Sequence, residues 1–201
     1  MEKIKWILFD LGGVVVHLLM QNPDGYTFKT RFFNQKELEG LFYTKEYINY
    51  MKGMISHEQF IGKYLQKKRL DLSVAELDEL IKQDIRLMPG MEELLAKLSV
   101  KYKIALATNE GKVFTKYKVE GSGIMQYLSK VIASYLLREV KPSPLFFKKM
   151  LSILDIKSDE CIFIDDTQEN IDAAKALGIQ SFLFTNVPQL ERDLNTILSS
   201  T

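Results

Sequence analysis

Carboxylates stand directly after two apolar runs of this sequence. Asp10 follows Trp6-Ile7-Leu8-Phe9 and precedes two glycines, and Asp165-Asp166 follows Ile162-Phe163-Ile164. Apolar runs this short are typical of buried strands. Carboxylates at the ends of such strands cost desolvation energy unless a cation or hydrogen-bond donors compensate. Because adjacent acids also repel each other, Asp165 and Asp166 indicate a cation nearby; the alternative is that these acids only cap turns or helices.

Two further polar stretches follow apolar runs. Thr108 and Asn109 come directly after Lys103–Ala107, and Lys141 precedes Pro142. A residue before proline disfavours helix, so Lys141 is predicted in a loop that presents its amine inward. Asp can attack phosphorus, hard oxygen ligands suit Mg²⁺, and a lysine with a hydroxyl can neutralise the transferring oxygens. If these strand ends converge, the residue types therefore predict phosphoryl transfer.

The elements that must position these residues alternate in type from residue 89 onward. Helical spacing and apolar runs predict strands at 103–107, 131–133, 161–164 and 181–184, with helices at 91–98, 111–119, 144–154 and 169–177 between and around them. Strand and helix in alternation predict an α/β fold with a parallel sheet and right-handed crossovers. Ligands bind such sheets beyond the carboxyl ends of the strands.

Residues from about 20 to 87 have a different texture, helical and polar-faced without a convincing strand. Ser56-His57-Glu58-Gln59 and Ser73-Val74-Ala75-Glu76 have the form of capping boxes that open two helices. We therefore predict an all-helical cap over residues 16–88, inserted into a catalytic core of residues 1–15 and 89–201. An insertion there would stand over the carboxyl edge of the sheet as a lid; alternatively, its helices only enlarge the core.

Composition narrows the class of protein. The 201 residues carry 27 basic and 26 acidic side chains, so a net charge of +1 gives no reason to expect nucleic acid or a membrane surface as partner. The single cysteine, Cys161, excludes an internal disulfide and suits a reducing compartment. With no secretory signal and no stretch long enough to cross a bilayer, the expected location is the cytoplasm. The sequence contains no indication of oligomeric state.

Four motifs in order resemble the haloacid dehalogenase superfamily, specifically subfamily I with a helical C1 cap. The matching stretches are Phe9-Asp10-Leu11-Gly12-Gly13-Val14-Val15, Ala107-Thr108-Asn109, Lys141-Pro142-Ser143-Pro144 with Phe146, and Ile164-Asp165-Asp166-Thr167 with Asn170 and Ala173-Ala174. The resemblance covers nearly the whole chain. It implies a Rossmann-like, three-layer parallel-sheet core and a Mg²⁺-dependent phosphatase that acts on a small phosphorylated metabolite.

The resemblance also implies a role for each matching position. Asp10 would attack phosphorus and share Mg²⁺ with the backbone carbonyl of Gly12 and with Asp165 and Asp166, one of them directly and the other through water. Thr108 and the backbone around Asn109 would hold phosphate oxygens. Lys141 would pair with Asp10 and the phosphate, and water would then hydrolyse the aspartyl-phosphate.

One position departs from the family pattern. Phosphatases of this family usually carry a second Asp two residues after the nucleophile as general acid and base, and here that residue is Gly12. Loss of such a group commonly costs about 10²–10⁴ in rate. Three explanations are open: His17 replaces it, the substrate has a good leaving group, or the protein has lost catalysis and kept ligand binding.

A second reaction within the family is hydrolysis of 2-haloacids, which uses the same nucleophile without metal. Adjacent acids at Asp165 and Asp166 favour phosphoryl chemistry, because the dehalogenases have no Mg²⁺ to hold. Candidate residues for substrate selection in the cap are His17, Tyr26, Lys45 and Tyr47.

Overall fold

The computed structural model describes residues 4–20, 22, 24–42 and 44–199. Its centre is a five-stranded parallel sheet in the order β5-β4-β1-β6-β7. The strands are β1 (Trp6–Phe9), β4 (Lys103–Thr108), β5 (Lys130–Ala133), β6 (Cys161–Asp165) and β7 (Gln180–Leu183). This order places β1 in the middle, with chain connections leading away on both sides, which is the topology that creates a ligand crevice at the carboxyl edge.

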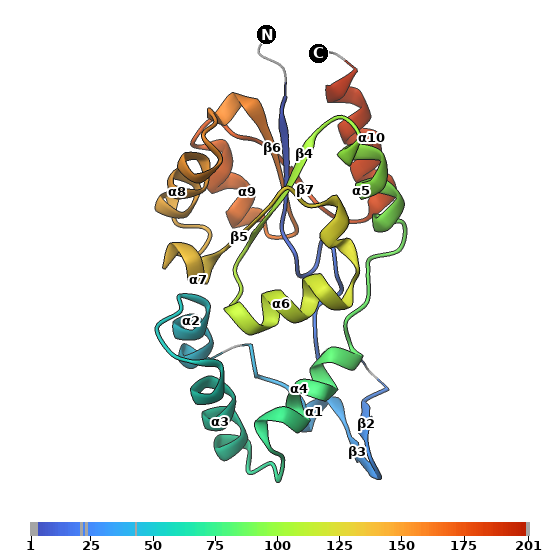
Figure 1. Cartoon of the computed structure of the whole chain (residues 1–201), viewed down its shortest axis with the longest axis vertical. Helices are drawn as coiled ribbons and strands as arrows, with labels where there is room; N and C mark the ends of the chain where they lie inside the picture. The colour runs from blue at the N-terminus through green and yellow to red at the C-terminus, as the bar shows by residue number, and fades with distance from the viewer. Residues whose placement is uncertain (1–3, 21, 23, 43, 200–201) are drawn as a thin grey trace.

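Helices cover both faces of the sheet because successive strand residues point to opposite sides. Ile7 and Phe9 of β1 pack with α5 (Met91–Ser99) and α10 (Val187–Leu198). Trp6 and Leu8 pack on the other face with α7 (Ser134–Leu137), α8 (Pro144–Leu154) and α9 (Gln168–Lys175). The three layers are visible in Figure 1 and confirm the predicted Rossmann-like α/β core.

The predicted all-helical cap is wrong in one respect, because it contains a hairpin. The cap helices are α1 (Gln35–Leu38), α2 (Lys45–Met51), α3 (His57–Lys68) and α4 (Val74–Gln83), preceded by β2 (Tyr26–Phe28) and β3 (Arg31–Phe33). Only Lys29 and Thr30 join these three-residue strands, with φ of +54° at Lys29. Asn-Gly or Asp-Gly, the usual sequence signal of a two-residue hairpin loop, is missing here.

Both predicted capping boxes of the cap are confirmed. The hydroxyls of Ser56 and Ser73 accept hydrogen bonds from the backbone N–H groups of Gln59 and Glu76, respectively. In turn, the side-chain oxygens of Gln59 and Glu76 accept from the backbone N–H groups of the two serines. Each box satisfies two helix-terminal donors and fixes where the helix begins. The buried face of α3 then contains Phe60, Ile61, Tyr64 and Leu65, as the spacing predicts.

The chain leaves and re-enters the core at adjacent points. Val16 bridges to Leu87, the His17 N–H donates to the Arg86 carbonyl at 2.9 Å, and the Met88 N–H donates to the Val15 carbonyl at 2.9 Å. The predicted division at residues 15/16 and 88/89 falls at these paired connections. Buried apolar side chains of the cap, among them Leu19, Phe60 and Ile81, form a hydrophobic cluster that also includes Phe114 from the core.

Helix α6 (Lys112–Gly121) lies between the sheet and the cap (Figure 1). Its first turn receives an acceptor from the cap, because the Tyr50 hydroxyl accepts from the N–H groups of Val113 and Phe114 at 3.2 and 3.3 Å. A Cβ at Gly111 would lie 2.3 Å from the Tyr50 ring, so this contact requires glycine. The cap is thus seated on the N-terminus of α6.

Helix length also bears on membrane insertion. The two longest helices, α3 and α10, have 12 residues each. Within the described ranges, no helix has the length and apolar character that a bilayer crossing requires.

Candidate active site

The strand ends bring the motif residues together. Phe9 pairs with Leu106 of β4 and with Ile164 of β6, so the residues that follow these positions lie at one edge of the sheet. Asp10 comes directly after β1, while Thr108 and Asp165 are the last residues of β4 and β6. The Asp10 N–H donates to the Ile164 carbonyl at 2.8 Å, which fixes the Asp10 backbone against β6.

Lys141 lies between two of these carboxylates. Its Nζ is 2.9 Å from Asp10 Oδ1 and 2.6 Å from Asp165 Oδ2, and its side chain is 1% exposed. Its backbone is held by Asn109, whose Oδ1 accepts from the Lys141 N–H at 2.7 Å and whose Nδ2 donates to the Lys141 carbonyl at 2.9 Å. The Asn109 side chain therefore positions the lysine loop, and the predicted contact of the Asn109 backbone with phosphate stays a prediction.

The charges in this cluster shift one another's ionisation. Burial raises the pKa of Asp10 to about 6, with Lys141 opposing this and the Asp165 charge adding to it. Burial alone would lower the pKa of Lys141, but the two carboxylates outweigh it and the net shift is upward. Lys141 therefore stays an ammonium. Oδ1 of Asp10 is buried, and among the described residues it has no hydrogen-bond partner of good geometry although Lys141 stands beside it.

The two adjacent acids have different surroundings. Asp165 is fully buried, and both its oxygens are engaged: Oδ2 with Lys141, and Oδ1 with the Thr167 N–H at 2.9 Å and Asn170 Nδ2 at 3.0 Å. Asp166 is half-buried, and its carboxylate accepts a long hydrogen bond of 3.5 Å from the Thr167 hydroxyl. Burial and the Asp165 charge raise the pKa of Asp166.

Gly13 lets Asp166 approach the loop after β1. Its φ is +86°, and a Cβ at this position would lie only 2.1 Å from Asp166 Oδ2. Any other residue would both strain the backbone and push the carboxylate away. Gly13 therefore allows close contact with Asp166, whereas the nearest side chain to Gly12 is that of Lys118.

The acids meet closely enough to share a cation. One carboxylate oxygen from each of Asp10, Asp165 and Asp166 lies within 4.8 Å of the others. Hard oxygen ligands with one partly open side suit Mg²⁺, which keeps several waters and binds substrate phosphate. The raised pKa values of Asp10 and Asp166 are what a cation between the clustered carboxylates would lower, so the residues fit a magnesium ion.

Comparison with known proteins identifies the family. The family model described as haloacid dehalogenase-like hydrolase matches residues 7–184. The chain belongs to this family. It is 27% identical over 204 residues to flavin mononucleotide hydrolase 1 of Arabidopsis thaliana, covering 98% of this chain and 78% of that protein. It is 26% identical over 214 residues to D-ribitol-5-phosphate phosphatase of Bacteroides thetaiotaomicron, covering 98% and 100%.

Solved structures show the same fold. The HAD family enzyme bt-2542 of Bacteroides thetaiotaomicron, in complex with magnesium and inorganic phosphate, superposes with a TM-score of 0.75 at 24% identity, covering 91% of this chain and 95% of that one. The L-2-haloacid dehalogenase PA0810 superposes with a TM-score of 0.69 at 18% identity, covering 90% and 83%. At these identities the likeness concerns the fold, which phosphatases and dehalogenases share.

Sequence reasoning missed two residues of this haloacid dehalogenase-like hydrolase. Glu110 and Lys118 form an ion pair next to Gly12, with side chains 2% and 7% exposed. Glu110 also accepts a hydrogen bond from the Tyr47 hydroxyl at 2.9 Å, which joins the cap to the core. Because Glu110 directly follows the second motif, its position in the sequence could have indicated that it lies near the site. No sequence feature indicates that Lys118 lies next to Gly12.

The other predicted cap residues differ in their surroundings. His17 lines a hollow of about 390 Å³ with Gly13 and Asp166, and among the described residues its side chain makes no hydrogen bond or ion pair with Asp10. Tyr26 donates to buried Asp84 at 2.8 Å, so it supports the cap interior. Lys45 is exposed at the start of α2. Of the four cap candidates, Tyr47 donates to a residue just beyond β4, and His17 lines a hollow with Asp166, which follows β6.

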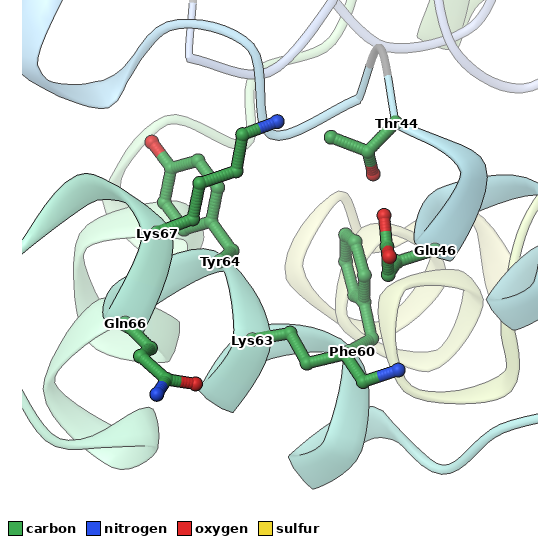
Figure 2. Close-up of a pocket in the computed structure, with 7 residues that line it drawn as sticks. All are labelled: Thr44, Glu46, Phe60, Lys63, Tyr64, Gln66 and Lys67. Atoms are coloured by element: carbon green, nitrogen blue, oxygen red, sulfur yellow. The ribbon is translucent and has the colours of Figure 1, made fainter.

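A separate hollow in the cap is unconnected with this chemistry. It holds about 260 Å³ between the start of α2 and the outer side of α3, and Figure 2 shows its polar rim of Thr44, Glu46, Lys63 and Lys67. None of its lining residues follows a core strand. We therefore place the candidate active site at the sheet edge.

Proposed function

We propose that this protein is a Mg²⁺-dependent hydrolase of small phosphomonoesters that works through an aspartyl-phosphate on Asp10. The observation that carries the proposal is the convergence of three carboxylates and one buried lysine on a single point at the carboxyl edge of the sheet. Relatives named as a flavin mononucleotide hydrolase and a ribitol-phosphate phosphatase, each aligned over 98% of this chain, support it.

Each core residue has a role in this reaction. Asp10 forms a bond to phosphorus through a carboxylate oxygen while the ester oxygen leaves, and water later attacks the same phosphorus. Lys141 keeps Asp10 ionised and donates hydrogen bonds to the phosphoryl oxygens. The hydroxyl of Thr108, at the end of β4, donates to the same oxygens. When bound, Mg²⁺ supplies charge neutralisation on the transferring oxygens.

The surroundings of the acids suggest how they would share the ion. Both oxygens of Asp165 are already engaged by Lys141, Thr167 and Asn170, whereas Asp166 has one long hydrogen bond. We assign Asp166, Asp10 and the carbonyl of Gly12 as direct ligands and Asp165 as the acid that acts through water. Asp165 would then mainly orient Lys141 and the turn before α9.

The cap is proposed to cover the substrate. It stands at the carboxyl edge of the sheet and contacts it through Tyr47 and Tyr50, which are positioned to exclude water and to select the organic part of the ester (Figure 1). The substrate class is a small phosphorylated metabolite. We propose the cytoplasm as the location, because the single cysteine, Cys161, suits a reducing compartment.

Mg²⁺-dependent release of orthophosphate from p-nitrophenyl phosphate and from a panel of sugar, polyol and flavin phosphates tests this function. We expect turnover with Mg²⁺ and its loss with excess EDTA, restored when Mg²⁺ is added back. A parallel assay of halide release from 2-chloropropionate tests the dehalogenase reaction. Metal-independent halide release without phosphate release would replace the proposal by dehalogenation. If neither phosphate nor halide is released although the protein binds Mg²⁺, the protein is a binding module.

A further inference from the structure

An ammonium group occupies the space beside Gly12. A Cβ built on Gly12 would lie 3.2 Å from the Nζ of Lys118, and its next neighbour would be Leu18 Cδ2 at 3.7 Å. A side chain at this position, two residues after Asp10, would therefore point at Lys118. Because Gly12 has no side chain, the amine of Lys118 itself reaches the loop that follows the nucleophile.

Lys118 is held in this position by buried partners. Its Nζ pairs with Glu110 Oε2, while Glu110 Oε1 accepts from the Tyr47 hydroxyl at 2.9 Å and from the Gly111 N–H at 3.3 Å. Glu110 is two residues beyond the end of β4, so the same sheet edge that presents Thr108 also fixes the lysine. Both oxygens of Glu110 are satisfied, which leaves the remaining ammonium hydrogens to donate elsewhere.

Burial of the Lys118–Glu110 ion pair costs free energy, which indicates a functional reason for its presence. Taking both members of an ion pair out of water loses hydration that their mutual attraction barely repays. Lys118 and Glu110 are 5% and 1% exposed, and apolar residues could fill the same volume between α6 and the loop after β1. The pair lies beside the loop that carries the nucleophile, since Lys118 Nζ is 3.2 Å from the Cβ position at Gly12, two residues after Asp10.

We propose that Lys118 is a further catalytic residue, which donates a hydrogen bond to the leaving-group oxygen of the phosphomonoester in place of the absent side chain at Gly12. This rests on the proposed phosphatase function. As Asp10 bonds to phosphorus, the bond from phosphorus to the ester oxygen breaks and its electron pair goes to that oxygen. The Lys118 ammonium stabilises the resulting negative charge, and the alkoxide takes its proton from solvent water. Glu110 and Tyr47 are positioning residues.

The test is the dependence of kcat/KM on the leaving group, measured with a series of substituted phenyl phosphates and with an alkyl phosphate. For Lys118→Met we expect less than a ~10-fold loss with p-nitrophenyl phosphate and a loss of about 10²-fold or more with the alkyl ester, because a poor leaving group needs the donor most. Lys116→Met, an exposed position on the same helix, is the control and should match the wild type across the series.

Two further variants keep the test decisive if Lys118→Met folds poorly. Glu110→Gln with Lys118→Met removes both charges and should show the same steeper dependence. Gly12→Asp with Lys118→Ser should restore the wild-type dependence, because removing the amine frees the space in which the new carboxyl group would lie.

The outcomes separate this inference from the proposed function. An equal loss for every leaving group, or no loss, in the Lys118 variants would overturn the role of Lys118 while leaving the phosphatase intact. Absence of phosphate release from the wild type would instead overturn the proposed function itself.

Discussion

Asp10→Asn is expected to reduce phosphate release by about 10⁴-fold or more, because an amide cannot attack phosphorus and the remaining groups act only around the missing bond. The fold should survive. The amide has the same shape, and at neutral pH it removes an ionised carboxyl group whose pKa burial raises to about 6. Steady-state assays with Mg²⁺, together with thermal unfolding in its absence, measure both effects.

Asp71→Asn provides the control for this substitution, since Asp71 is an exposed acid in the cap. It should leave both turnover and unfolding temperature unchanged. Mg²⁺ should raise the unfolding temperature of the wild type and of Asp71→Asn. The increase should be smaller for Asp10→Asn, because a ligand that binds the folded state more weakly stabilises it less. Turnover of Asp10→Asn at the wild-type rate would show that another residue is the nucleophile.

Lys141→Met is expected to destabilise the protein by about 3–5 kcal/mol at neutral pH, because it leaves Asp10 and Asp165 buried without their common cation. Turnover should be lost as well. The effect should depend on pH with a definite sign. Without the lysine the pKa of Asp10 rises further above its ordinary value, so Asp10 is easier to bury protonated, and the destabilisation grows as pH rises from about 5 to 8.

Urea unfolding at pH 5 and pH 8 measures this dependence. Lys148→Met, an exposed position on α8, is the matched control and should change stability little at either pH. Saturating Mg²⁺ should recover part of the lost stability in Lys141→Met, since the ion neutralises the same carboxylates. A loss below about 1 kcal/mol that is the same at both pH values would contradict a central role for Lys141 in compensating the two acids.

Local signals predicted the core well. The apolar run before Asp10 and the runs that end at Thr108 and at Asp165 are parallel strands, and their parallel direction follows from strand-helix alternation. The turn at Lys141 follows from the proline after it. These elements were predictable because each depends on residues within one short segment.

The features that sequence reasoning missed depend on contacts between distant segments or on weak local signals. The hairpin at residues 26–33 has no glycine in its turn, so its turn sequence does not predict it. Burial of Tyr26 and Phe33 in the cap stabilises the hairpin instead. The final helix, α10, was also not predicted, although Asn186 caps it and Pro188 lies in its first turn.

The candidate site shows the same limit. Asp10, Asp165, Asp166 and Lys141 converge as the motifs indicate, because strand ends in a parallel sheet must meet at one edge. The different surroundings of Asp165 and Asp166 come from hydrogen bonds of the turn before α9, and the neighbour of Gly12 comes from α6. Both require the tertiary structure, since neither spacing nor residue type encodes them.

A crystal structure with Mg²⁺ and beryllium fluoride, which mimics a phosphoryl group on a carboxylate, tests the central claim most directly. We predict beryllium bonded to Asp10, fluorine atoms in contact with Thr108 and Lys141, and Mg²⁺ bound by Asp10, Asp166 and the Gly12 carbonyl. Beryllium on another side chain, or Mg²⁺ bound away from Asp10 and Asp166, would contradict the proposed phosphoryl-transfer site.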